Sequence, residues 1–88
     1  MNKNRRKELA VIVAKLEELE ALRLEIQEEL ETVMAEEQEA LDNMPESLQD
    51  GEKGQQMQEY IEAMENVLDD LEEIDIDSIR DQIDDIVG

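Results

Sequence analysis

The chain has 88 residues, a formal net charge of −19, one aromatic residue, and neither cysteine nor histidine. A chain without cysteine has no disulfide framework and no thiol nucleophile, and one without histidine lacks the commonest general base and the commonest metal ligand. We therefore expect a single domain that is not an enzyme and that holds no cofactor or metal.

The negative charge is concentrated beyond the first 23 residues. From residue 24 onward only Lys53 and Arg80 oppose 23 carboxylates, so this stretch alone carries −21. Such a surface repels nucleic acid and anionic membranes and attracts basic partners. We expect a protein partner with a basic surface, no direct nucleic-acid binding and no membrane association.

A first helix is expected at about residues 5–42, where apolar residues recur with alternating spacings of three and four. With Leu9 at position a of a heptad, the d positions are all apolar, and Arg23 and Glu37 occupy two of the a positions. We interpret Arg23 as neutralised by an acid of the second helix. The d residues expected in the buried seam are Ile12, Leu19, Ile26, Val33 and Ala40.

The apolar run Leu9–Ala14 is too short for a signal-peptide core or a membrane span, and Lys15 and Glu17 end it. We therefore expect a cytoplasmic protein.

A loop is expected at about 43–51, because Pro45 disfavours helical geometry at the residue before it. Pro45–Leu48 can begin a helical turn of its own. A second helix is expected at about 52–74 and a short third helix at about 77–87, with Ser78-x-x-Asp81 as a capping box at its start.

These lengths predict an all-α fold, an antiparallel, coiled-coil-like helical hairpin with a short third C-terminal helix. Folding the chain about Gln49 places Ile83 and Ile86 against Ile12 and Leu16. A chain of this length has a marginal core, so we expect a homodimer that forms a four-helix-type bundle. The apolar residues off the seam that favour this dimer are Val11, Leu22 and Leu24.

Rows of surface carboxylates are the feature best suited to a function, because they can stand in for nucleic-acid phosphates in a basic groove. An alternative site is an apolar tip at the loop end, made of Met44, Leu48, Met57 and Tyr60. A second class of function is a structural or assembly coiled-coil factor whose acidity serves only solubility. The candidate partner-binding carboxylates are Glu25, Glu28, Glu29 and Glu36 of the first helix and Glu62, Glu65, Asp69 and Glu72 of the second.

The stretch Asn43-Met44-Pro45-Glu46-Ser47-Leu48-Gln49, together with the basic start Arg5-Arg6-Lys7 and the acidic first helix, resembles a family of small acidic helical proteins. These proteins are encoded by phages, prophages and mobile elements of Gram-positive bacteria. The resemblance implies an accessory protein in a bacterial host cell and no known activity. Combined with the charge, it favours a protein that binds or inhibits a basic host protein, including one that acts in host defence.

Overall fold

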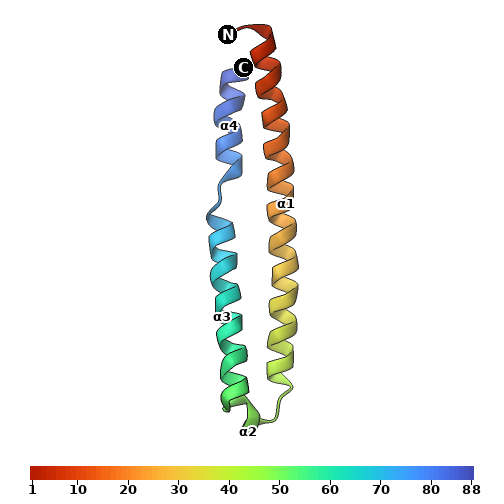
Figure 1. Cartoon of the computed structure of the whole chain (residues 1–88), viewed down its shortest axis with the longest axis vertical. Coiled ribbons are helices and arrows are strands. Elements are labelled where there is room, and N and C mark those ends of the chain that lie inside the picture. Colours follow the sequence, from red (N-terminus) through yellow and green to blue (C-terminus); the bar gives the residue numbers. More distant parts are fainter. The chain divides into compact units, whose positions relative to one another are not determined.

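The computed structural model describes all 88 residues. It contains four helices and no strand (Figure 1). The helices are α1 (Lys3–Asp42), α2 (Glu46–Gln49), α3 (Glu52–Glu73) and α4 (Ile76–Val87). The predicted all-α class is confirmed. The chain divides into two compact units, and α1 contributes to both of them.

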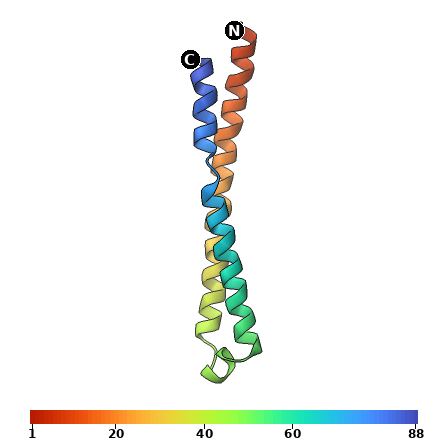
Figure 2. The ribbon, with the colours of Figure 1, turned by 90° about the vertical axis from the view of Figure 1, so that its left-hand side faces the viewer.

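The first unit, here called the terminal unit, consists of Met1–Glu25 and Ile74–Gly88. It pairs the first part of α1 with α4, and these segments lie side by side in both ribbon views (Figures 1 and 2). Its buried residues are Val13 of α1 and Ile76 of α4, with Leu16 and Ile83 half-buried. The two ends of the chain thus belong to one unit, as predicted, and Leu16 and Ile83 are half-buried in it, whereas Ile12 and Ile86 are exposed.

The second unit, here called the loop unit, is Ile26–Glu73. It contains the rest of α1, the single-turn helix α2 and the antiparallel helix α3. Its buried apolar residues are Leu41, Ile61 and Leu68. The Gln27 amide donates a hydrogen bond to the carboxylate of Glu72 at 3.4 Å, which joins α1 and α3 at the far end from the loop.

The buried seam of α1 keeps the predicted a positions, but the residue after each predicted d position is covered in place of the d residue itself. The predicted d residues Ile12, Leu19, Ile26 and Val33 are 44–51% exposed, and Ala40 is exposed as well. The residues that are covered recur at alternating spacings of four and three. These seam residues are Leu9, Val13, Leu16, Glu20, Arg23, Gln27, Leu30, Met34, Glu37 and Leu41 of α1, and Met44 just beyond its end.

This shift has a physical cause in the width of the apolar face of α1. Ile12 and Val13 are adjacent and both apolar, as are Val33 and Met34, so apolar residues cover more than one stripe of the helix. One partner helix covers one stripe only, and the other stays open to solvent. The partner segments present their own seam residues, which are Gly54, Met57, Ile61, Met64, Leu68 and Leu71 of α3 and Ile76, Arg80, Ile83 and Val87 of α4.

The loop is held by Gln49 and by a close approach at Gly54. The Gln49 side-chain amide donates hydrogen bonds to the backbone oxygens of Leu41 at 3.1 Å and Met44 at 2.8 Å. Leu41 lies in the last turn of α1, where carbonyls have no partner within the helix, and Met44 lies just beyond the end of the helix. A Cβ atom at Gly54 would lie 2.0 Å from the backbone oxygen of Gln49, so only glycine allows α3 to approach α2 this closely.

The start of α4 differs from the predicted capping box. The N-cap residue is Asp75, whose carboxylate accepts a hydrogen bond from the backbone N–H of Ser78 at 3.0 Å. Ser78 is thus the third residue of the helix rather than its cap, and α4 begins at Ile76 instead of residue 77. The side chain of Ile76 is 4% exposed, so the helix starts where an apolar residue enters the core of the terminal unit.

Candidate functional site

The position of a residue relative to the seam decides which side of a helix it occupies. Successive residues are rotated by about 100° around the axis, so the residue after a seam residue lies on one side of the helix and the residue before it on the other. Because α1 and α3 are antiparallel, residues that follow seam residues lie on the same side of the pair in both helices. The same holds for α1 and α4 in the terminal unit.

In the loop unit, the residues that follow the seam are strongly acidic. Each of the last four seam residues of α3, from Ile61 to Leu71, is followed directly by an exposed carboxylate. On α1, Glu28 follows Gln27 and Glu31 follows Leu30, and both are exposed. We call these six residues the acidic side: Glu28, Glu31, Glu62, Glu65, Asp69 and Glu72.

The acidic side contains five of the eight carboxylates selected from the sequence. All eight are exposed. Glu29 and Glu36 precede seam residues and so lie toward the opposite side, and Glu25 lies on the back of α1. Sequence reasoning missed Glu31, although it directly follows Leu30, which is an a position of the predicted heptad as well. The eight residues therefore do not form one surface, whereas the six residues of the acidic side do.

The terminal unit has the same arrangement around Arg80. The residues that follow the seam of α4 are Asp77, Asp81 and Asp84. The Arg80 guanidinium donates a hydrogen bond to Asp81 at 3.1 Å and lies 3.4 Å from a carboxylate oxygen of Asp77. The hydrogen bond to Asp81 and the negative charges of Asp77 and Glu17 raise the pKa of the Arg80 guanidinium. Arg80 is therefore paired with two carboxylates of its own helix, Asp77 and Asp81.

Arg23 occupies the α1 seam together with Glu20, one turn earlier. The Arg23 Nε atom donates a hydrogen bond to the Glu20 carboxylate at 2.8 Å, and both side chains are only 15% exposed. This pair places a charged layer in a position that an apolar residue normally fills.

The four residues of the alternative tip site do not share one environment. Met44 and Met57 are half-buried in the seam, as expected for residues that fill the core. Leu48 of α2 and Tyr60 of α3 are 53% and 52% exposed. A tip site would therefore present Leu48 and Tyr60, with the two methionines beneath the surface.

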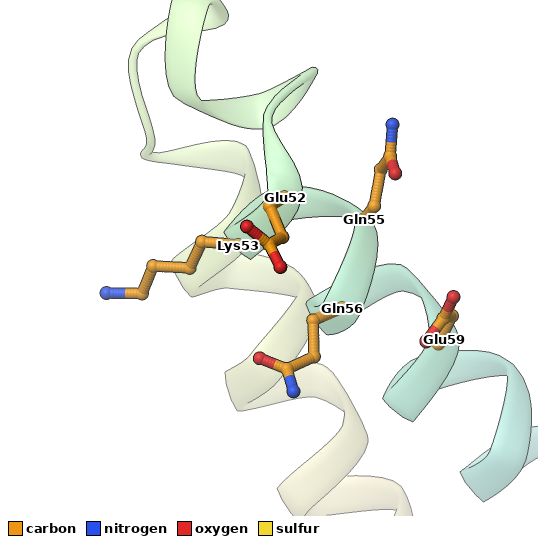
Figure 3. Close-up of a pocket in the computed structure, with 5 residues that line it drawn as sticks. All are labelled: Glu52, Lys53, Gln55, Gln56 and Glu59. Atoms are coloured by element: carbon orange, nitrogen blue, oxygen red, sulfur yellow. The ribbon is translucent and has the colours of Figure 1, made fainter.

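A hollow lies at the start of α3 and is lined by Glu52, Lys53, Gln55, Gln56 and Glu59 (Figure 3). All five residues are exposed, and all are polar or charged. Figure 3 shows their side chains pointing in different directions rather than toward a common point. The hollow offers no apolar lining and no convergent set of polar groups for a small ligand.

The carboxylates do not gather into a metal site, because no group of three or more acidic residues is placed to hold an ion. None of the four helices combines the length and the apolar character that crossing a membrane requires. Comparison of the chain with protein-family models, with curated proteins and with solved structures gave no match.

Proposed function

We propose that this chain is a non-catalytic interaction protein that binds the basic surface of a protein partner through the acidic side of its loop unit. The partner is one whose basic groove otherwise holds nucleic acid, so the protein inhibits it by nucleic-acid mimicry. The resemblance noted above supports a phage or mobile-element protein that acts in the cytoplasm of a bacterial host as part of this proposal. We expect it to work as a homodimer of the four-helix type.

The observation that carries this proposal is the uninterrupted row of carboxylates on α3. Glu62, Glu65, Asp69 and Glu72 follow one another at spacings of three and four residues. On an α-helix these spacings place the Cβ atoms of successive acidic residues about 5–6 Å apart, so the carboxylates form a regular row of negative charge, as the phosphates of a nucleic-acid strand do. The only hydrogen bond described for these four side chains comes from the neutral amide of Gln27, so their charges are available to a cationic partner.

The test exchanges the α3 carboxylates for neutral isosteres in one variant, Glu62→Gln, Glu65→Gln, Asp69→Asn and Glu72→Gln. A partner is first recovered from a bacterial lysate, and its binding is then measured with purified proteins at several salt concentrations. Long-range attraction sums over a charged face, so the complex should weaken by more than about tenfold in this variant. Wild-type binding should also weaken steeply as salt rises, and the protein should displace DNA from its partner.

The matched control removes the same number of charges from the other surfaces of α1, with Glu25→Gln, Glu29→Gln, Glu36→Gln and Glu39→Gln. Binding by this variant should fall much less than binding by the α3 variant. Equal losses would show that only net charge matters. Complete loss in a Leu48→Ala, Tyr60→Ala variant, with full binding by the α3 variant, would move the site to the apolar tip and refute mimicry.

The exposed apolar residues of α1 favour one other function, a structural or assembly factor whose acidity serves solubility. Ile12, Leu19, Ile26 and Val33 recur every seven residues and remain uncovered in the single chain. An assembly built on such residues should hold or tighten as salt rises, whereas a complex with a basic partner should dissociate. Salt dependence therefore separates the two functions.

A further inference from the structure

The beginning of α1 carries a cluster of positive charge without an ion pair. Four of its first five residues are basic and exposed, and none of the four is paired with a carboxylate. Residues 1–15 contain five basic residues and one acid, Glu8, so this stretch has a charge of +4. We call the four residues at the beginning of α1 the basic turn: Lys3, Arg5, Arg6 and Lys7.

The local structure of the basic turn disfavours its own charge. The Asn2 side chain accepts a hydrogen bond from the backbone N–H of Arg5 at 2.8 Å, so α1 begins with a side-chain cap. The beginning of a helix is the positive end of its dipole, where cations are unfavourable and anions are favourable. The first turn of α1 contains no acidic residue that would offset the cations. An anionic partner would therefore be attracted by the side chains and by the helix dipole together.

The loop unit presents the opposite charge. It contains 17 acidic residues and one basic residue, Lys53, and so has a charge of −16. None of the six carboxylates of its acidic side forms an ion pair. The chain thus has an unpaired cationic cluster in the terminal unit and an unpaired anionic row in the loop unit.

Spacing and extent favour a second copy of the chain as the anionic partner. Lys3 is followed by Arg6 and Lys7 at spacings of three and four, the spacings that also separate the acidic residues of the α3 row. Both sets therefore repeat once per helical turn, and two helices side by side can match them. A nucleic acid or an anionic membrane extends far beyond four cations and would also meet the other carboxylates of the chain, which repel it. The row on α3 ends after four residues.

We infer that the basic turn of one copy binds the acidic side of a second copy, so that the free protein covers its own partner-binding surface. This inference rests on the proposed function, because it uses the same acidic side, and it names how that site is regulated. A basic partner must displace the basic turn. The contact is heterologous, since each copy offers one basic turn and one acidic side, and copies therefore add in series.

Salt and concentration give the first test, by sedimentation velocity of the full chain. At ~0.1 M salt the Debye length is about 10 Å, so charges in contact attract while more distant carboxylates of the two copies are screened. The sedimenting mass of wild type should therefore rise with concentration at ~0.1 M salt. The association constant should fall about tenfold or more at ~0.5 M salt. A four-helix-type dimer held by apolar residues would not weaken in this way.

The second test compares two double variants that remove the same charge. Lys3→Gln with Lys7→Gln changes the basic turn, and Lys15→Gln with Lys53→Gln changes two exposed lysines outside it. The basic-turn variant should weaken association at ~0.1 M salt about tenfold or more, and the control should weaken it less than about threefold. Helix content by circular dichroism should be unchanged or higher in the basic-turn variant, because cations at the beginning of a helix are unfavourable.

The third test mixes two variants with complementary defects. The variant with the four α3 exchanges keeps its basic turn, and the basic-turn variant keeps its acidic side. Neither should associate with itself as wild type does at ~0.1 M salt. Mixed together, they should form a complex with each other whose dissociation constant lies within about threefold of the wild-type value, and ~0.5 M salt should dissociate it.

The inference is overturned if the mixture forms no such complex, if the two lysine pairs have equal effects, or if the association persists unchanged at ~0.5 M salt. Tighter binding of the basic turn to a DNA duplex or to vesicles of anionic lipid than to a second copy would also overturn it. Failure of the proposed function looks different, because copies would still associate while no basic partner bound the acidic side. Where both hold, the basic-turn variant binds its partner more tightly than wild type at concentrations that favour self-association.

Discussion

Gly54 shows how one residue fixes the geometry of the loop. In the interior of an exposed helix, replacing glycine by alanine stabilises by roughly 1 kcal/mol, because alanine has the higher helix propensity. At Gly54 the added methyl group would instead collide with the backbone oxygen of Gln49, and backbone cannot move aside as a flexible side chain does. Packing therefore opposes propensity at this position, and packing is the larger effect.

We expect Gly54→Ala to lower the free energy of unfolding by about 1–3 kcal/mol, measured by urea denaturation, because α3 must shift away from α2. Gly51→Ala is the control, since a Cβ atom there would lie 3.3 Å from the nearest backbone oxygen and a small adjustment accommodates it. A Gly54→Ala variant more stable than wild type would contradict the close packing of α2 and α3.

At the scale of a helix, α4 depends on how its first turn is capped. The Asp75 carboxylate accepts the Ser78 N–H, and its negative charge also lies at the positive end of the helix dipole. The sequence pattern Ser78-x-x-Asp81 matched a capping box equally well. What decides between them is the position of Ile76, whose burial requires that the helix begin before Ser78.

Asp75→Ala should therefore cost about 1 kcal/mol of stability, and Ser78→Ala should cost less than about 0.5 kcal/mol. Asp75→Asn keeps a capping oxygen and should lie near wild type. Thermal denaturation followed by circular dichroism measures all three variants. If Ser78→Ala proved the more damaging change, the cap would be the one that the capping-box pattern indicates.

At the scale of the whole molecule, repulsion among carboxylates opposes folding. The 27 acidic residues outnumber the eight basic ones. Two of the basic residues form ion pairs within their own helices, Arg23 with Glu20 and Arg80 with Asp77. Added salt shortens the Debye length and so screens repulsion between exposed charges that lie farther apart than this length. The chain should gain stability from salt rather than lose it.

The melting temperature at neutral pH should thus rise by several degrees when NaCl is increased from ~0.05 to ~0.5 M, and unfolding should be cooperative. Potassium chloride serves as a control for a specific effect of sodium. A fall in melting temperature with salt would mean that ion pairs such as Arg80–Asp77 contribute more than repulsion takes away.

The sequence by itself determined the all-α class, the stop near Pro45 and the break near Asp75, because proline geometry, helix propensity and capping act between residues close in the chain. It also identified the acidic character of α3, because Glu62, Glu65, Asp69 and Glu72 directly follow apolar residues that recur at helical spacing in the sequence.

Only the tertiary structure decided which half of the apolar face of α1 is buried. Ile12 and Val13, or Val33 and Met34, are equivalent in the sequence, because both are apolar and both fit a seven-residue repeat. Pairing with α3 and α4 covers Val13 and Met34 and leaves Ile12 and Val33 exposed. A small rotation of α1 about its axis changes few local interactions, so contacts between helices decide it.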